Sequence, residues 1–112
     1  MDISFEGYAA QAATFYADDA VLPGSAVMLG ENLTVYPVEE NADILGVALA
    51  VRDGCATVQT AGAVRLPCSS TLYEGFTPLT VDSEGRVIEC ETGPVRLVLS
   101  IDRYENTAII ML

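Results

Sequence analysis

The sequence predicts an all-β fold, and three observations lead to that prediction. Short apolar runs recur along the chain, each bounded by Gly, Pro, Asn or Asp. No segment keeps the apolar period of a helix for more than about two turns. The order of strands and turns also repeats along the chain. We expect a small barrel or β-sandwich of about eight short strands, with one more if the region of Phe15 is extended, in two pseudo-repeated halves.

The longest apolar hairpin lies in residues 44–67. Residues 44–51 form a nearly continuous apolar run, Arg52-Asp53-Gly54 is a turn, and residues 56–66 alternate as one long strand. A hairpin with two apolar arms must bury both of them. We therefore expect it to be the central ribbon of the fold.

The other elements are shorter and take their boundaries from turn residues. Leu22-Pro23-Gly24 is a turn because Pro presets its own φ and Gly accepts a positive φ. Pro37 places its strand at a sheet edge, since proline cannot donate to a ladder. The expected strands are residues 15–21, 26–29, 33–38, 78–81, 86–90, 95–101 and 107–112, with an irregular crossover or a helical turn at 68–75.

The two halves of the repeat are residues 24–66 and 75–112. Each half runs Gly, strand, turn, strand, break, apolar strand, polar turn, strand, although the identity between them is low. Chance spacing in an all-β chain stays open as the alternative. If the repeat is real, the two ribbons should face each other across one core, with these residues buried: Val47, Leu49, Val58, Val64, Leu97, Leu99 and Ile109.

The chain divides into an extended N-terminal arm, residues 1–14, and a single β-barrel domain, residues 15–112. The arm carries spaced apolar groups but no turn that would return a partner strand. Packing on its own barrel and packing on a neighbouring chain both stay open. The candidate partner-interface residues are Ile3, Phe5, Tyr8, Phe15 and Tyr16.

Charge excludes some classes of partner. Sixteen Asp and Glu face five Arg, with no Lys or His, for a formal charge of −11. Nucleic-acid binding needs clustered basic side chains and is not expected. No apolar run approaches the ~20 residues of a membrane span, and the acidic first residues do not resemble a signal peptide. We expect synthesis in the cytoplasm and neutral or basic partner surfaces, although keeping the protein soluble is by itself a sufficient explanation of the acidic charge.

No residue pattern predicts an enzyme, a cofactor or a metal site. Cys55, Cys68 and Cys90 form no C-x-x-C pair, and without His or Lys nothing activates a thiolate at the loop residue Cys68. Cys55 and Cys90 fall in or beside strands, where we expect buried thiols. Residues 82–85, DSEG, read as a hairpin turn. The acidic loop 39–43 leaves adventitious calcium binding as an alternative.

The chain resembles the head decoration, or capsid cement, proteins of phages. The resemblance lies in AVLPGSAVMLG (20–30), LGVALA (45–50), AGAVRLP (61–67) and GFTPLTVDSEGRV (75–87), and it covers most of the chain after Asp19. It implies a β-barrel without catalytic activity that binds the major capsid protein lattice on the capsid exterior of the virion. A homo-oligomer is implied as well, with a trimer favoured over a monomer. Two alternatives stay open: a phage tail or baseplate component, and a small-ligand or calcium-binding β-barrel.

Overall fold

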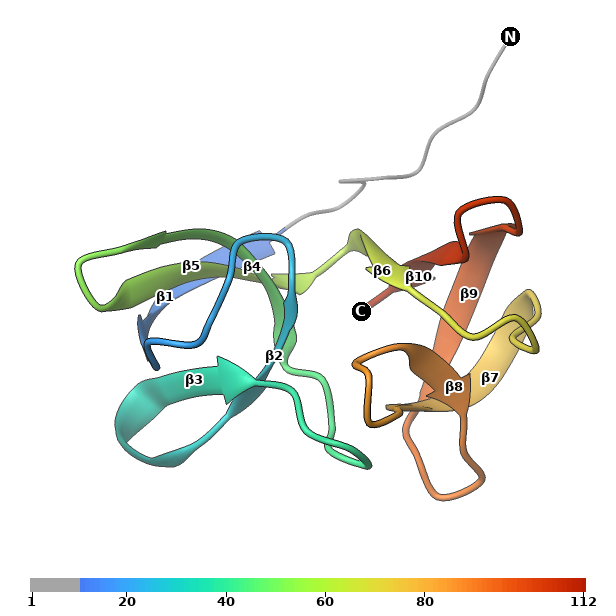
Figure 1. Cartoon of the computed structure of the whole chain (residues 1–112), viewed down its shortest axis with the longest axis horizontal. Helices are drawn as coiled ribbons and strands as arrows, with labels where there is room; N and C mark the ends of the chain where they lie inside the picture. Colours follow the sequence, from blue (N-terminus) through green and yellow to red (C-terminus); the bar gives the residue numbers. More distant parts are fainter. Residues whose placement is uncertain (1–10) are drawn as a thin grey trace, which may run out of the picture.

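The predicted central hairpin is present as strands β4 (Gly46–Arg52) and β5 (Cys55–Ala61). Asp53 and Gly54 form its turn with positive φ values of 53° and 77°, which is the backbone that two-residue hairpin turns require. The computed structural model describes residues 11–112 (Figure 1). Within them it contains strands and one short 3₁₀ turn, so the all-β prediction is confirmed.

The first five strands form a closed barrel in the order β1-β3-β2-β4-β5. Strand β1 closes it by pairing antiparallel with β5 and, through Tyr16 and Ala17, parallel with β3. The remaining bounds in this half are β1 (Gln11–Ala17), β2 (Ala26–Leu29), the 3₁₀ turn η1 (Glu31–Leu33) and β3 (Thr34–Pro37).

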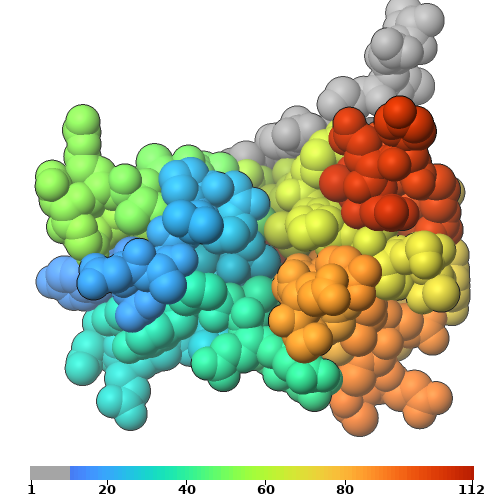
Figure 2. All heavy atoms as spheres, viewed as in Figure 1, coloured from blue at the N-terminus to red at the C-terminus, as the bar shows by residue number. Residues whose placement is uncertain are grey.

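The last five strands form a second sheet in the order β6-β10-β9-β7-β8. Its members are β6 (Ala63–Pro67), β7 (Gly75–Val81), β8 (Val87–Glu89), β9 (Val95–Asp102) and β10 (Thr107–Met111). The barrel, blue to green, and the second sheet, yellow to red, pack side by side (Figure 2). Hydrogen bonds from Asn41 N to Val81 O (3.1 Å) and from Thr80 Oγ1 to Ala42 O (3.4 Å) join them.

The strand orders confirm the predicted repeat. Read from its third strand, the closed barrel runs β3-β2-β4-β5-β1, and the second sheet runs β8-β7-β9-β10-β6. Each strand of the first half therefore has a counterpart five strands later. The equivalent units are β1–β5 and β6–β10, so β6, which we expected in the first half, opens the second.

The second unit contains an equivalent of the β1–β3 contact that closes the barrel, but this contact involves fewer residues. In the barrel, Asp18 N donates to Val35 O at 2.9 Å beside two parallel β1–β3 pairs. In the second unit, Ser69 N donates to Val87 O at 3.0 Å beside a single parallel bridge between Cys68 and Val87. The second unit is thus a five-stranded sheet whose edge strand β8 is bridged, at one residue pair, to the segment that follows its other edge strand β6.

A β-bulge recurs at the same place in both units. The β4–β5 register skips Leu49, and the β9–β10 register skips Leu99. A bulge bends its strand and increases its local twist. The two bulges therefore help each sheet to curl around its own interior.

The expectation of a single strand at residues 56–66 is wrong, because Gly62 interrupts the strand. Gly62 has a φ of 91°, a conformation that L side chains rarely adopt, and it separates β5 from β6. The two strands consequently belong to different sheets. The alternating pattern is continuous in the sequence, but a glycine can redirect the chain between two apolar segments.

The expectation of one core is also wrong, since the buried apolar side chains form two clusters. The barrel cluster contains Val21, Val27, Val35, Ala48, Ala56 and Val58. The second cluster fills the other sheet and includes three side chains of the first half, Ala26, Ile44 and Val47. Two curled sheets each enclose an interior, and the second interior extends to the junction between them.

The predicted buried set is correct at four of its seven positions. Val47, Val58, Val64 and Ile109 are buried. Leu49 is half exposed, and Leu97 and Leu99 are partly exposed. Leu49 and Leu99 occupy the bulges, where the alternation of faces that we used to assign burial is interrupted.

The barrel begins earlier than we expected. Residues Gln11 to Thr14, placed in the arm, belong to β1 and pair with β5 from Ala61 to Thr57. The arm boundary at residue 14 therefore cuts through a strand. Residues 1–10 lie outside the described residues.

Candidate interaction surfaces

The candidate interface residues occupy different environments. Ile3, Phe5 and Tyr8 lie outside the described part of the chain. Phe15 is partly buried and packs against the barrel core, whereas Tyr16, next to it on β1, is 61% exposed. Alternate residues of a strand face opposite sides, so of the two described candidates Tyr16 has the exposed ring.

The outer face of the second sheet carries an apolar row that sequence reasoning missed. Phe76 on β7 pairs with Leu97 on β9, and Leu97 pairs with Met111 on β10. Directly paired residues share one face of a sheet. Phe76 is 78% exposed, and Val95, on the same face as Leu97, is 64% exposed. We call Phe76, Pro78, Val95, Leu97 and Met111 the outer apolar face.

The residue pattern of the two strands explains why this face was missed. Residues 95–101 are an expected strand with an apolar run, VRLVLSI, and we expected its Leu97 and Leu99 to be buried. The partner strand, however, begins with Phe76-Thr77-Pro78, and Thr77 is the buried member, at 2% exposed. Threonine inside and phenylalanine outside reverses the usual alternation, so hydrophobicity alone assigns the wrong face.

The two units also expose an apolar side chain at equivalent turns. Leu22 and Tyr73 each follow a buried residue, Val21 and Leu72, and each is more than half exposed. In the second unit Arg103 stabilises this turn, because its guanidinium donates to the carbonyl oxygens of Ser70 and Leu72. A hydrogen bond to Glu89 raises the pKa of the Tyr73 hydroxyl.

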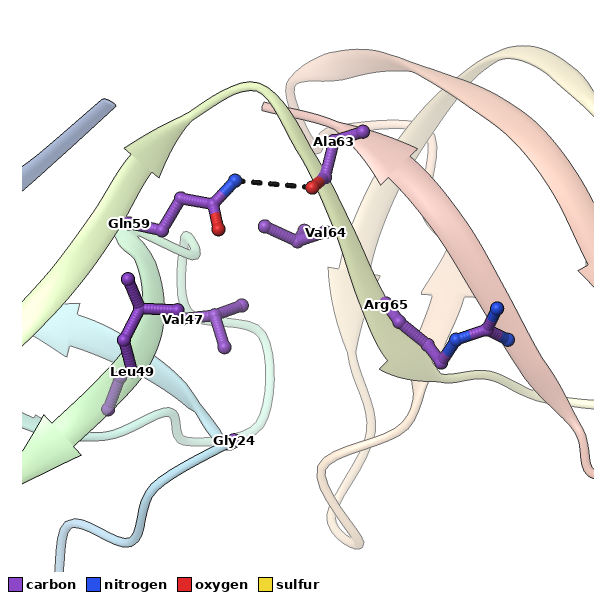
Figure 3. A pocket seen from close by; sticks show the side chains of 8 residues that line it. Gly24, Val47, Leu49, Gln59, Ala63, Val64 and Arg65 are labelled. Carbon is purple, nitrogen blue, oxygen red and sulfur yellow. Dashed lines mark hydrogen bonds between the residues drawn. The ribbon is translucent and has the colours of Figure 1, made fainter. Parts of the chain in front are cut away.

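A pocket lies at the junction of the two units (Figure 3). It has a volume of about 460 Å³ and lies between β4 and β5 on one side and β6 on the other. Its lining comprises Gly24, Val47, Ala48, Leu49, Gln59, Ala63, Val64 and Arg65. The guanidinium of Arg65 points away from Gln59 (Figure 3), and its Nη1 donates to Thr107 Oγ1 at 3.0 Å.

Gln59 is the buried polar residue of this pocket, with 6% of its surface exposed. Its Nε2 donates to the carbonyl oxygens of Ala61 at 3.1 Å and Ala63 at 3.2 Å, on either side of Gly62. The backbone N–H of Leu112 donates to the Gly62 carbonyl at 2.9 Å. Three consecutive carbonyls of the inter-unit connection are thus satisfied.

The acidic loops do not converge. Within residues 11–112, no group of three or more His, Cys, Asp or Glu side chains is arranged to hold a metal ion. Glu39, Glu40 and Asp43, the alternative calcium ligands, are all exposed.

The DSEG segment forms the expected hairpin turn around one carboxylate. Asp82 Oδ1 accepts from the backbone N–H groups of Glu84 and Arg86, and Oδ2 accepts from Arg86 Nε, each at 2.9 Å. The backbone N–H of Arg86 is the main cause that lowers the pKa of Asp82.

The three cysteines are free thiols, but their burial differs from the prediction. Cys68, interpreted as a loop residue, is buried at the parallel bridge, while Cys55 and Cys90 are partly exposed. Burial raises the pKa of the Cys68 thiol, and Arg103 offsets part of that rise. A hydrogen bond with the Thr92 hydroxyl, at 3.3 Å, lowers the pKa of Cys90.

Over the described range of 11–112, no helix is long and apolar enough to cross a membrane. Comparison of the chain with protein-family models and with curated proteins finds no match.

Proposed function

We propose that this protein is a non-catalytic decoration, or cement, protein that binds the assembled major capsid lattice of a phage. The observation that carries the proposal is the outer apolar face. Phe76 and Val95 project from adjacent paired strands and are mostly exposed. Exposed apolar side chains that lie together on rigid strands are typical of docking surfaces.

The charge of the chain supports the same role. A formal charge of −11 favours docking on basic or neutral protein surfaces and opposes contact with DNA. The closed barrel has few open strand edges, which limits unspecific association at the high local concentration of a lattice. A symmetric lattice favours a symmetric oligomer, and we propose a trimer.

Co-sedimentation with expanded capsids tests the proposal. The wild-type protein should pellet with capsids, and Phe76→Ser should weaken binding by about tenfold or more, because it removes a large apolar contact. Tyr104→Ser is the matched control, since Tyr104 is 96% exposed in the β9–β10 turn away from this face. A wild-type protein that does not pellet with capsids rejects the proposal.

The same assay separates the alternatives. Purified tails in place of capsids test the tail or baseplate role. A protein that binds neither particle, and whose melting temperature rises with Ca²⁺ or a small ligand, would be a ligand-binding barrel instead. Light scattering of the free protein distinguishes the trimer from a monomer.

Removal of residues 1–10 tests the N-terminal contribution. Because β1 begins at Gln11, this deletion spares every described strand. We expect an unchanged melting temperature and weaker capsid binding. A truncated protein that melts far lower yet binds normally would show that the segment packs on its own domain.

A further inference from the structure

The junction pocket contains a hydrogen-bond acceptor that the fold itself does not use. Both partners of the Gln59 amide are carbonyl oxygens, so the nitrogen must face them and the oxygen must face the other way. In Figure 3 this oxygen points from Gln59 toward Val64 and Val47. It therefore lies at the wall of the pocket.

The environment of this oxygen shows that it is reached from the pocket. Among the described residues, no fully buried side-chain nitrogen or oxygen lacks a hydrogen-bond partner. The Gln59 oxygen accepts no hydrogen bond, so it must be accessible, although the residue as a whole is 94% buried (100 − 6). A buried amide whose acceptor opens into a cavity fits a ligand that brings a donor.

The remaining lining residues favour a ligand with an apolar body. Val47, Leu49 and Val64 contribute branched side chains, and Gly24, Ala48 and Ala63 leave room between them. A volume of about 460 Å³ is within the range of small-molecule sites and accommodates an aromatic ring. The ligand thus has an apolar ring and one polar end.

Charge decides between the donors that could fill this space. The lining residues include no carboxylate, so a buried lysine or arginine would lose its hydration without gaining an opposite charge. A carboxylate would place a negative oxygen near the Gln59 oxygen, where no hydrogen is available. A neutral O–H or N–H satisfies both conditions.

We propose that the junction pocket binds a neutral aromatic side chain with an O–H or N–H donor, the chemistry of tyrosine or tryptophan, presented by the docking partner. The inference rests on the proposed function in naming the source of that side chain. It gives the repeat a role, because neither unit forms the pocket alone: β4 and β5 supply one wall and β6 supplies the other.

The pocket can be tested with free probes on the full chain. We expect p-cresol, the tyrosine side-chain analogue, to perturb the NMR signals of the Gln59 amide, Val47 and Val64. Toluene has the same ring without the donor and should bind about threefold to tenfold more weakly, the range expected for one hydrogen bond. Equal affinity for the two probes, or no perturbation at these residues, overturns the proposal.

Two leucine variants provide the matched pair. Leu49 is half exposed at the pocket, so Leu49→Ala should fold and should weaken p-cresol binding by about threefold or more. Leu99→Ala changes the equivalent bulge residue of the second unit and should leave binding unchanged. A larger loss of p-cresol binding in Leu99→Ala than in Leu49→Ala overturns the proposal.

Capsid binding by the same variants separates this inference from the proposed function. Leu49→Ala should reduce co-sedimentation, while Leu99→Ala should not. If the wild type and Leu49→Ala pellet equally, the capsid does not supply the ring: the inference fails and the proposed function stands. If the wild type does not pellet while p-cresol binds as described, the proposed function fails, and with it the assignment of the ring to a capsid protein.

Discussion

The amide nitrogen of Gln59 donates to the carbonyl of Ala63 at 3.2 Å, across the glycine that separates the two units. The same nitrogen also donates to the carbonyl of Ala61, which precedes that glycine, at 3.1 Å. One side chain at the end of the barrel thereby bridges the residues on both sides of the glycine. This contact lies at the wall of the pocket and joins the two units alongside the Asn41–Val81 and Thr80–Ala42 hydrogen bonds.

Replacement of Gln59 by Leu should destabilise the fold. Both carbonyls lose a donor, and Ala63 is buried, so the free energy of unfolding should fall by about 2–4 kcal/mol. Urea denaturation measures the change. Gln11→Leu, at an exposed position of β1, should stay within about 0.5 kcal/mol of wild type. Equal effects at the two glutamines would contradict the role of Gln59.

Gly46→Ala should destabilise the barrel through a direct clash. A Cβ at Gly46 would lie 2.1 Å from the backbone oxygen of Gln59 and 2.8 Å from Val58 Cγ1, and a backbone atom cannot move aside cheaply. We expect a loss of about 2 kcal/mol or more in thermal or urea unfolding. Gly85→Ala is the control: its Cβ meets nothing within 4 Å, so only its φ of 79° matters, at about 1 kcal/mol.

Asp82 should contribute stability that depends on pH. Its folded pKa lies below the ordinary value of 3.8, so the contribution is fully present above that value and is lost as pH falls through the folded pKa. Asp82→Asn should therefore be less stable than wild type at neutral pH, and the difference should shrink below about pH 4. Urea midpoints across pH 2–7 measure it. Asp19→Asn removes a carboxylate at an exposed position and is the comparison variant for the change in net charge.

The three thiols should react at different rates in the native protein. Cys90 is partly exposed and its pKa is lowered by Thr92, whereas Cys68 is buried and its pKa is raised. Because the thiolate is the nucleophile, iodoacetamide at about pH 8 should modify Cys90 first and Cys68 last. Peptide mass spectrometry resolves the order. In denaturant the three rates should become similar. Rapid modification of Cys68 in the native protein would contradict the expected order and would mean that the bridge between Cys68 and Val87 opens readily.

Local patterns in the sequence were sufficient for the elements and their repetition. The Asp53-Gly54 turn and the DSEG turn at Asp82 were predicted from the residues that those turns require, and the structure contains both. The order of strands in the two halves was visible because turn residues and apolar runs are encoded within a few positions of each other.

The placement of the candidate site could not be read in the same way. The outer apolar face was not predicted, and its member Leu97 was assigned to the core, because only the sheet register shows that Leu97 shares a face with the exposed Phe76. The pocket was missed because its walls come from strands that the sequence presents as one continuous segment.

The sequence by itself determined an all-β chain of short strands in two similar halves, since turn chemistry and alternation act over neighbouring residues. Only the tertiary structure decided that the halves enclose two cores, that β6 belongs to the second half, and that Gln59 faces a pocket. The physical reason is Gly62. A positive φ at one residue redirects everything after it. At Gly62 that conformation is accompanied by hydrogen bonds from the neighbouring Gln59 and from Leu112, which lies far away in the sequence, just after β10.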